Sequence, residues 1–101
     1  MTEETVKSLF DLAADETVAV GNRLLEEHPD ADAWEIASGL VAGAVHFWLY
    51  THQPCGDTGC EACAGFSTAE LRLRRLLEEV RQSAAESSYY HTPQDTNAGT
   101  A

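Results

Sequence analysis

Basic residues are scarce in this chain of 101 residues, in which lysine and arginine number 6 against 17 aspartates and glutamates. Lys7 is the only lysine. The formal net charge of -11 repels phosphate groups, which disfavours nonspecific binding to nucleic acid and to anionic membrane surfaces. We therefore expect neither nucleic acid nor a membrane among its partners.

We also expect neither a secretory leader nor an apolar run long enough to span a membrane. The N-terminal segment contains Glu3, Glu4 and Lys7 where a signal peptide has an apolar core. The strongly apolar stretch 36–50 has 15 residues. As a helix it is about 22 Å long, short of a hydrocarbon core of about 30 Å. We therefore expect a cytoplasmic protein in which this stretch is a buried helix.

Cysteine is limited to three residues, all within a short segment: Cys55, Cys60 and Cys63. An odd number leaves one thiol over from any disulfide framework, and nothing else in the sequence points to an oxidising compartment. Clustered cysteines in a cytosolic chain are typical of metal binding or redox chemistry. The cysteine segment is therefore the candidate functional site.

Thiolates and a neutral imidazole are the donors that zinc prefers, and four of them form a closed structural site. The spacing C-x4-C-x2-C contains the two-residue gap that lets a pair of sulfurs hold one ion, and Gly56 and Gly59 let the backbone bend around it. The nearest histidine, His52, is the expected fourth ligand, followed by His91 from the C-terminal tail and then His46. The sequence thus predicts a zinc site formed by Cys55, Cys60, Cys63 and His52, with His91 or His46 as the alternative fourth ligand.

The segment CGDTGCEAC resembles plant-type ferredoxins in its cysteine spacing. Those proteins supply a distant fourth cysteine and are rich in strands, and this chain has neither feature. The resemblance implies an iron–sulfur cluster as the alternative cofactor. The corresponding alternative function is a redox protein that uses the cysteines as cluster ligands or as cycling thiols.

The fold expected from the apolar periodicity is all-α, a small bundle of three helices. A break near Asp15 would make it four helices. Asp32 with Glu35, and Ser67 with Glu70, form capping-box pairs that start the second and third helices. We expect helices at about 3–27, 33–51 and 68–86, a metal loop at 52–64, a single domain over 1–87 and a polar tail at 88–101.

The second helix is apolar around most of its circumference, which is typical of a helix covered on all sides. Because a short domain offers few neighbours, we expect a homodimer that pairs through this helix. Gly39 and Gly43 lie on one face and would let another backbone come close, and the cost in helix propensity of about 1 kcal/mol each hints at a packing role. Two tolerated glycines are an equally good interpretation. Phe47 and Trp48 complete the expected dimer or core face.

The third helix carries arginines spaced for i,i+4 pairing with glutamate: Glu70 with Arg74, Arg74 with Glu78, and Arg75 with Glu79. This pattern favours a solvated face over a nucleic-acid surface, and leaves a DNA-binding regulator as a further alternative. No phosphate loop, nucleophile elbow or HExxH motif is present. The acidic balance resembles that of salt-adapted proteins such as those of haloarchaea, and an ordinary acidic protein fits it equally well. We expect a non-enzymatic interaction or regulatory protein with an unidentified protein partner.

Overall fold

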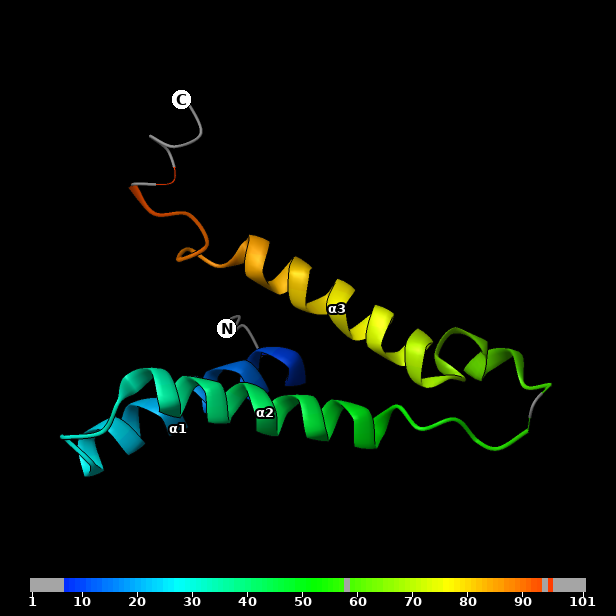
Figure 1. The fold of residues 1–101 in the computed structure, drawn as a ribbon, viewed down its shortest axis with the longest axis horizontal. Coiled ribbons are helices and arrows are strands. Elements are labelled where there is room, and N and C mark those ends of the chain that lie inside the picture. Colours follow the sequence, from blue (N-terminus) through cyan, green and yellow to red (C-terminus); the bar gives the residue numbers. More distant parts are fainter. Residues whose placement is uncertain (1–6, 58, 94, 96–101) are drawn as a thin grey trace, which may run out of the picture. The chain divides into compact units, whose positions relative to one another are not determined.

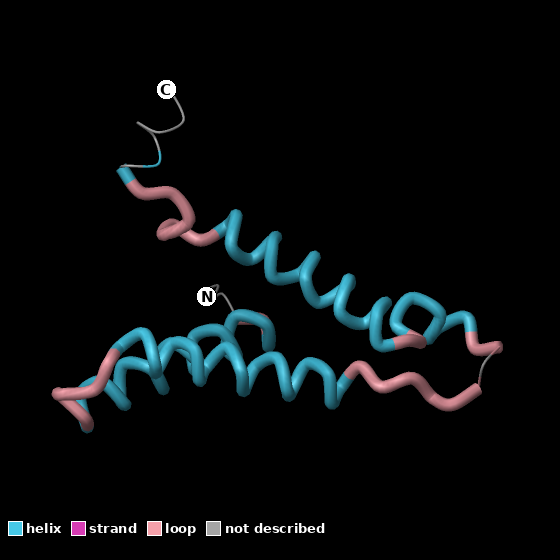
Figure 2. Tube along the Cα trace, in the orientation of Figure 1, coloured by secondary structure: helices cyan, strands magenta, loops and turns pink. Residues whose placement is uncertain are grey.

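The computed structural model describes residues 7–57, 59–93 and 95, and every regular element in this part of the chain is helical. Figures 1 and 2 show the elements in order along the chain. They are α1 (Leu9–Glu27), α2 (Ala33–Thr51), a short 3-10 helix η1 (Glu61–Phe66) and α3 (Ala69–Glu86). The expected all-α fold with three main helices and the cysteine loop between the second and third is confirmed. The 3-10 helix was not expected.

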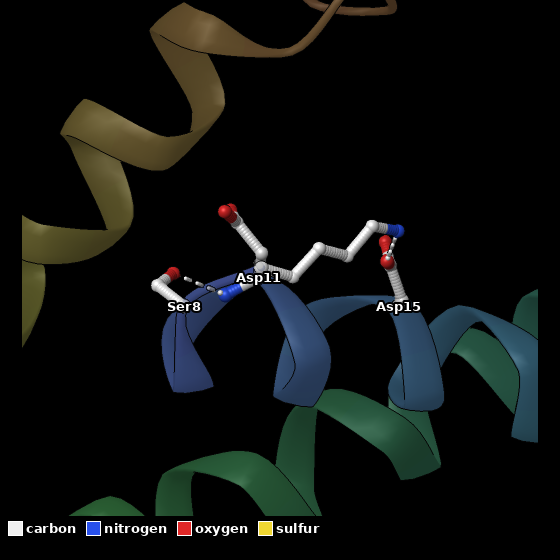
Figure 3. A network of polar contacts seen from close by, with 4 residues as sticks. Ser8, Asp11 and Asp15 are labelled. Carbon is white, nitrogen blue, oxygen red and sulfur yellow. Dashed lines mark hydrogen bonds and ion pairs between the residues drawn. The ribbon is translucent and has the colours of Figure 1, made fainter. Parts of the chain in front are cut away.

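Helix α1 begins at Leu9, later than the position near residue 3 that the periodicity predicts. The reason is local: Ser8 has an extended backbone, and its Oγ accepts a hydrogen bond of 3.1 Å from the Asp11 backbone N–H, as Figure 3 shows. Lys7 forms an ion pair with Asp15 across this first stretch of the helix. The earlier part of the predicted helix, residues 1–6, lies outside the described residues.

The chain divides by its internal contacts into two units, Met1–Phe47 and Trp48–Ala101. In the first unit, α1 and the beginning of α2 run antiparallel, side by side (Figure 1). Gly21 permits this approach, because a Cβ atom at that position would lie 3.0 Å from Leu40 Cδ1. Asp32 starts α2 as expected, since its Oδ1 accepts a hydrogen bond of 2.9 Å from the Trp34 backbone N–H. The single domain over 1–87 stays a prediction.

In the second unit, the cap of α3 lies one residue later than predicted. The N-cap is Thr68, whose side chain accepts a hydrogen bond of 3.1 Å from the Leu71 backbone N–H. The expectation that Ser67 caps this helix is wrong. Ser67 has helical backbone angles at the end of η1, and its hydroxyl lies 3.4 Å from the Ala64 carbonyl oxygen. The unexpected 3-10 helix therefore takes the residue that the capping-box pattern assigned to α3.

The third helix also uses its charged side chains differently from the i,i+4 pattern. The two ion pairs in the described part of the chain, Lys7 with Asp15 and Arg23 with Glu27, both lie on or beside α1. The predicted pairs along α3 are therefore not formed. Leu76 of α3, 8% exposed, is the one buried apolar side chain among the described residues. Within the same residues, no helix is both long enough and apolar enough to cross a lipid bilayer.

Candidate metal centre

The loop after α2 turns sharply at Gly56 and Asp57. Gly56 has a φ of 94°, a left-handed conformation that glycine adopts without steric cost. The carboxylate of Asp57 then accepts a hydrogen bond of 3.0 Å from the Gly59 backbone N–H. Its main-chain carbonyl accepts another of 3.0 Å from the Cys60 N–H. Together these turns bring Cys60 back toward Cys55.

The 3-10 helix places the third thiol beside the other two. Cys60 is the N-cap of η1, and the Cys63 backbone N–H donates a hydrogen bond of 3.3 Å to its carbonyl oxygen. The Sγ atoms of Cys55, Cys60 and Cys63 all lie within 4.8 Å of one another. Cys55 is exposed, the other two are half-buried, and all three are free thiols. A sulfur cluster therefore lies between α2 and α3, as expected from the spacing.

The size of this cluster fits a single ion. A zinc–sulfur bond is about 2.3 Å, so two sulfurs on one tetrahedral ion lie roughly 3.8 Å apart. Sulfur atoms within 4.8 Å of one another need only a small closure to reach that separation. A hollow of about 200 Å³ beside Cys60 and Cys63, also bordered by Pro54 and Ser67, leaves room for further ligand atoms. The three cysteines could therefore bind a metal ion.

The thiols of Cys60 and Cys63 differ in acidity because of their contacts within the cluster. The backbone N–H of Cys63 lowers the pKa of Cys60 most, and the thiols of Cys55 and Cys63 lower it further. The Cys60 side chain accepts no hydrogen bond that would cap η1. The Cys63 N–H therefore acts on the Cys60 sulfur as a nearby dipole. For Cys63, the backbone of Cys55 lowers the pKa, but the Cys60 side chain, burial and the Cys55 side chain together outweigh it and raise the pKa. Of these two thiols, Cys60 is therefore the one that loses its proton more readily.

The histidines lie outside the group of three sulfurs. His52 follows α2 directly, and its ring stacks on Trp48 with centroids 3.6 Å apart and an interplanar angle of 7°. His91 contacts the Tyr90 ring edge-on at 4.8 Å. His46 is an exposed residue within α2. That His52, or else His91 or His46, provides the fourth ligand stays a prediction.

The sequence patterns did not identify a set of contacts between aromatic and charged side chains in the same unit as the cluster. The Phe66 ring meets the His52 ring edge-on at 5.8 Å, and the Arg75 guanidinium lies 5.6 Å from the Phe66 ring centroid. Trp48 Nε1 donates a hydrogen bond of 3.0 Å to the Glu79 carboxylate. These residues join the end of α2 to η1 and α3. The one sign of these contacts in the sequence is an aromatic residue on each side of the cysteine loop, Trp48 before it and Phe66 after it.

The chemistry of this centre is therefore that of soft sulfur donors on a short, turn-rich loop. Such donors suit zinc, copper(I) and iron–sulfur clusters. The four residues of the expected dimer face stay a prediction, and one of them, Trp48, makes contacts within its own chain. No protein-family model matches the chain, and neither a curated protein nor a solved structure matches it.

Proposed function

We propose that this chain is a small cytoplasmic interaction or regulatory protein without enzymatic activity, stabilised by one structural zinc ion. The observation that carries the proposal is the convergence of the Cys55, Cys60 and Cys63 sulfur atoms within 4.8 Å of one another. Three thiolates that meet around one point repel one another unless a cation or protons lie between them. Zinc removes this repulsion and bonds each sulfur.

A structural role follows from where the cysteines lie. Cys55 is on the loop that leaves α2, whereas Cys60 and Cys63 belong to the start of η1, which leads to α3. An ion bound to all three closes this loop. Small domains have little core to stabilise them, and metal ligation adds directly to the free energy of folding. With Leu76 as the one buried apolar residue in the described part of the chain, we expect this addition to matter.

The proposal includes pairing of two chains through α2, within a bundle of helices. After Glu35 in its first turn, this helix has no charged residue, so it is where two chains of charge -11 meet with least repulsion. Trp34 and Val41 on α2 are 83% and 62% exposed. Added Cβ atoms at Gly39 and Gly43 would meet nothing within 4 Å. These observations support uncovered surface along α2.

The test is native mass spectrometry combined with elemental analysis of protein purified without oxygen. We expect one zinc per chain, and loss of helical circular dichroism when a chelator removes it. Replacing Cys60 or Cys63 with serine removes a sulfur donor, and we expect it to lower the thermal midpoint far more than His28→Ala. His28 is a fair control, because it ends α1 through its backbone N–H and lies outside the sulfur cluster.

Three results would contradict the proposal. Full helicity in the metal-free protein would remove the structural role of the ion. Visible absorption bands from bound iron and sulfide would instead favour the redox alternative, in which the same cysteines hold an iron–sulfur cluster. Protein without any metal, and with three reduced thiols, would eliminate both the structural zinc and the iron–sulfur cluster.

A further inference from the structure

The imidazole of His52 is held in one orientation by its neighbours. It stacks on the Trp48 indole with centroids 3.6 Å apart, and the second aromatic ring beside it is that of Phe66, edge-on at 5.8 Å. Its Nδ1 atom lies 2.8 Å from the main-chain carbonyl oxygen of Trp48. A ring held in this way has lost most of its rotational freedom before any ligand arrives.

The contact with this carbonyl determines which ring nitrogen carries the proton. A carbonyl oxygen only accepts hydrogen bonds, so Nδ1 of His52 must be the donor. The neighbouring Thr51 hydroxyl agrees with this assignment. It donates to the same Trp48 carbonyl at 2.9 Å, which leaves its oxygen free to accept from His52 Nδ1 at 3.2 Å. In the neutral ring, Nε2 is therefore unprotonated and has a lone pair.

This tautomer is the one that metal-binding histidines use. A ligating imidazole commonly donates its second N–H to a backbone carbonyl, which fixes the ring and raises the basicity of the ligating nitrogen. Neither His46 nor His91, both within the described part of the chain, makes a hydrogen bond of this kind. His46 also belongs to the unit Met1–Phe47, whereas His52 and the cysteines belong to the unit Trp48–Ala101.

The chain between His52 and the first thiol is short and able to bend. Gln53 and Pro54 separate His52 from Cys55, and Gly56 follows with its left-handed backbone. An ion bound to the Cys55 sulfur is therefore within a short loop closure of the imidazole. His52 lies outside the group of sulfurs within 4.8 Å, so metal binding must close this segment.

We infer that His52 completes the metal site as its fourth ligand through Nε2, with the Trp48 carbonyl as the outer partner that fixes its tautomer. This inference rests on the proposed metal site of the three cysteines. It also gives the ion a route to α3: through His52 and the Trp48 ring stacked on it, the ion is connected to Glu79, which accepts the indole N–H. Metal occupancy and the contact between the end of α2 and α3 are then coupled.

The test compares His52→Phe with His91→Phe and His46→Phe in the full chain. Phenylalanine keeps a flat ring against Trp48 and Phe66 but has no nitrogen donor, so the fold is preserved. We expect His52→Phe to weaken zinc binding by at least about tenfold, the smaller loss seen when even an outer partner of a ligand is removed. The two control variants should bind zinc as the unchanged protein does. Affinity is measured by competition with a chromophoric chelator.

The cobalt(II)-substituted protein gives a second readout that a merely structural role would not change. Replacing a nitrogen ligand by water alters the ligand-field bands, while the thiolate charge-transfer bands from the cysteines remain. Nitrogen-15 NMR of the metal-free protein should show His52 protonated at Nδ1, with Nε2 shifting when zinc is added.

The outcomes separate this inference from the proposed site. Unchanged zinc affinity and cobalt bands in His52→Phe, with metal still bound by the three cysteines, would overturn the inference and leave the site standing. Loss of binding in His91→Phe or His46→Phe alone would also overturn it. If the unchanged protein binds no metal, both fail together.

Discussion

At the scale of single residues, two thiols of the metal-free cluster, Cys60 and Cys63, should titrate in a definite order. The Cys63 backbone N–H and the adjoining thiols lower the pKa of Cys60, whereas the Cys60 side chain and burial raise that of Cys63. As the pH rises, Cys60 therefore loses its proton before Cys63. We expect the thiolate ultraviolet absorbance of Cys63→Ser, which keeps the Cys60 thiol, to rise at lower pH than that of Cys60→Ser, which keeps the Cys63 thiol.

The control for this titration is the same measurement in denaturant, where the contacts are lost and the variants should titrate alike. Identical folded-state curves for Cys60→Ser and Cys63→Ser would contradict the expected order of ionisation. The same order has a consequence for metal binding. Because a metal must displace the thiol protons, zinc affinity should fall as the pH falls.

The residues of the site were only partly accessible from the sequence. Cys55, Cys60 and Cys63 could be named from their spacing, because a short loop with two glycines leaves three sulfurs few ways to avoid one another. The surroundings of His52 could not. Its stack on Trp48 is local, but its contact with Phe66 depends on how η1 folds back, and no periodicity reports that.

At the scale of secondary-structure elements, the start of α3 offers a direct test of which residue caps it. The Thr68 side chain accepts the Leu71 N–H at 3.1 Å, whereas Ser67 lies at the end of η1. Loss of an N-cap typically costs about 1 kcal/mol. We expect Thr68→Ala to lower the free energy of unfolding by about this amount, measured by urea denaturation, and Ser67→Ala to have a smaller effect. A larger effect of Ser67→Ala would restore the capping box with Glu70.

A second element-scale prediction concerns the junction of α2 and α3. Trp48 Nε1 donates to the Glu79 carboxylate at 3.0 Å, and neither partner is buried. A net hydrogen bond of this kind is worth about 1 kcal/mol. Glu79→Ala should therefore lower the free energy of unfolding by about that amount and change the tryptophan fluorescence. The neighbouring Glu78→Ala is the matched control, and an equal loss in both variants would mean that helix charge, not the hydrogen bond, is responsible.

The difference between predicted and observed partners on α3 has a physical cause. Pairs at i,i+4 such as Arg75 with Glu79 are worth only a few tenths of a kcal/mol on an exposed helix. Longer-range contacts compete easily with so small a gain. Arg75 instead lies over the Phe66 ring, and Glu79 accepts the Trp48 indole N–H. Helix type and approximate position follow from local periodicity, whereas side-chain partners depend on elements distant in the sequence.

At the scale of the whole molecule, charge and apolar surface act in opposite directions. A chain of formal charge -11 repels its own copies, so association needs a surface free of charge. The large apolar side chains left exposed occur on all three main helices, for example Phe10 at 73%, Trp34 at 83% and Leu73 at 53%. Of these helices, α2 is the one whose central and C-terminal parts contain no acidic residue. A homodimer is therefore expected to form there and to strengthen as salt screens the repulsion.

The glycines of α2 distinguish a dimer face from a tolerated irregularity. Within its own chain, a Cβ atom at Gly39 or Gly43 meets nothing within 4 Å. Alanine there should raise the stability of an isolated chain by about 1 kcal/mol per site through helix propensity. If two α2 helices approach closely at these glycines, the added methyl groups instead separate them and weaken the dimer.

Sedimentation equilibrium of the Gly39→Ala, Gly43→Ala double variant at several concentrations therefore decides between the two interpretations. We expect the unchanged protein to sediment as a dimer, and the double variant to shift toward the monomer mass. Gly21→Ala is the control, because its Cβ atom would press on Leu40 Cδ1 at 3.0 Å inside the α1–α2 pair and should alter stability without altering mass. A double variant that is more stable and has the unchanged mass would place the contact between chains, if there is one, on a face other than this one.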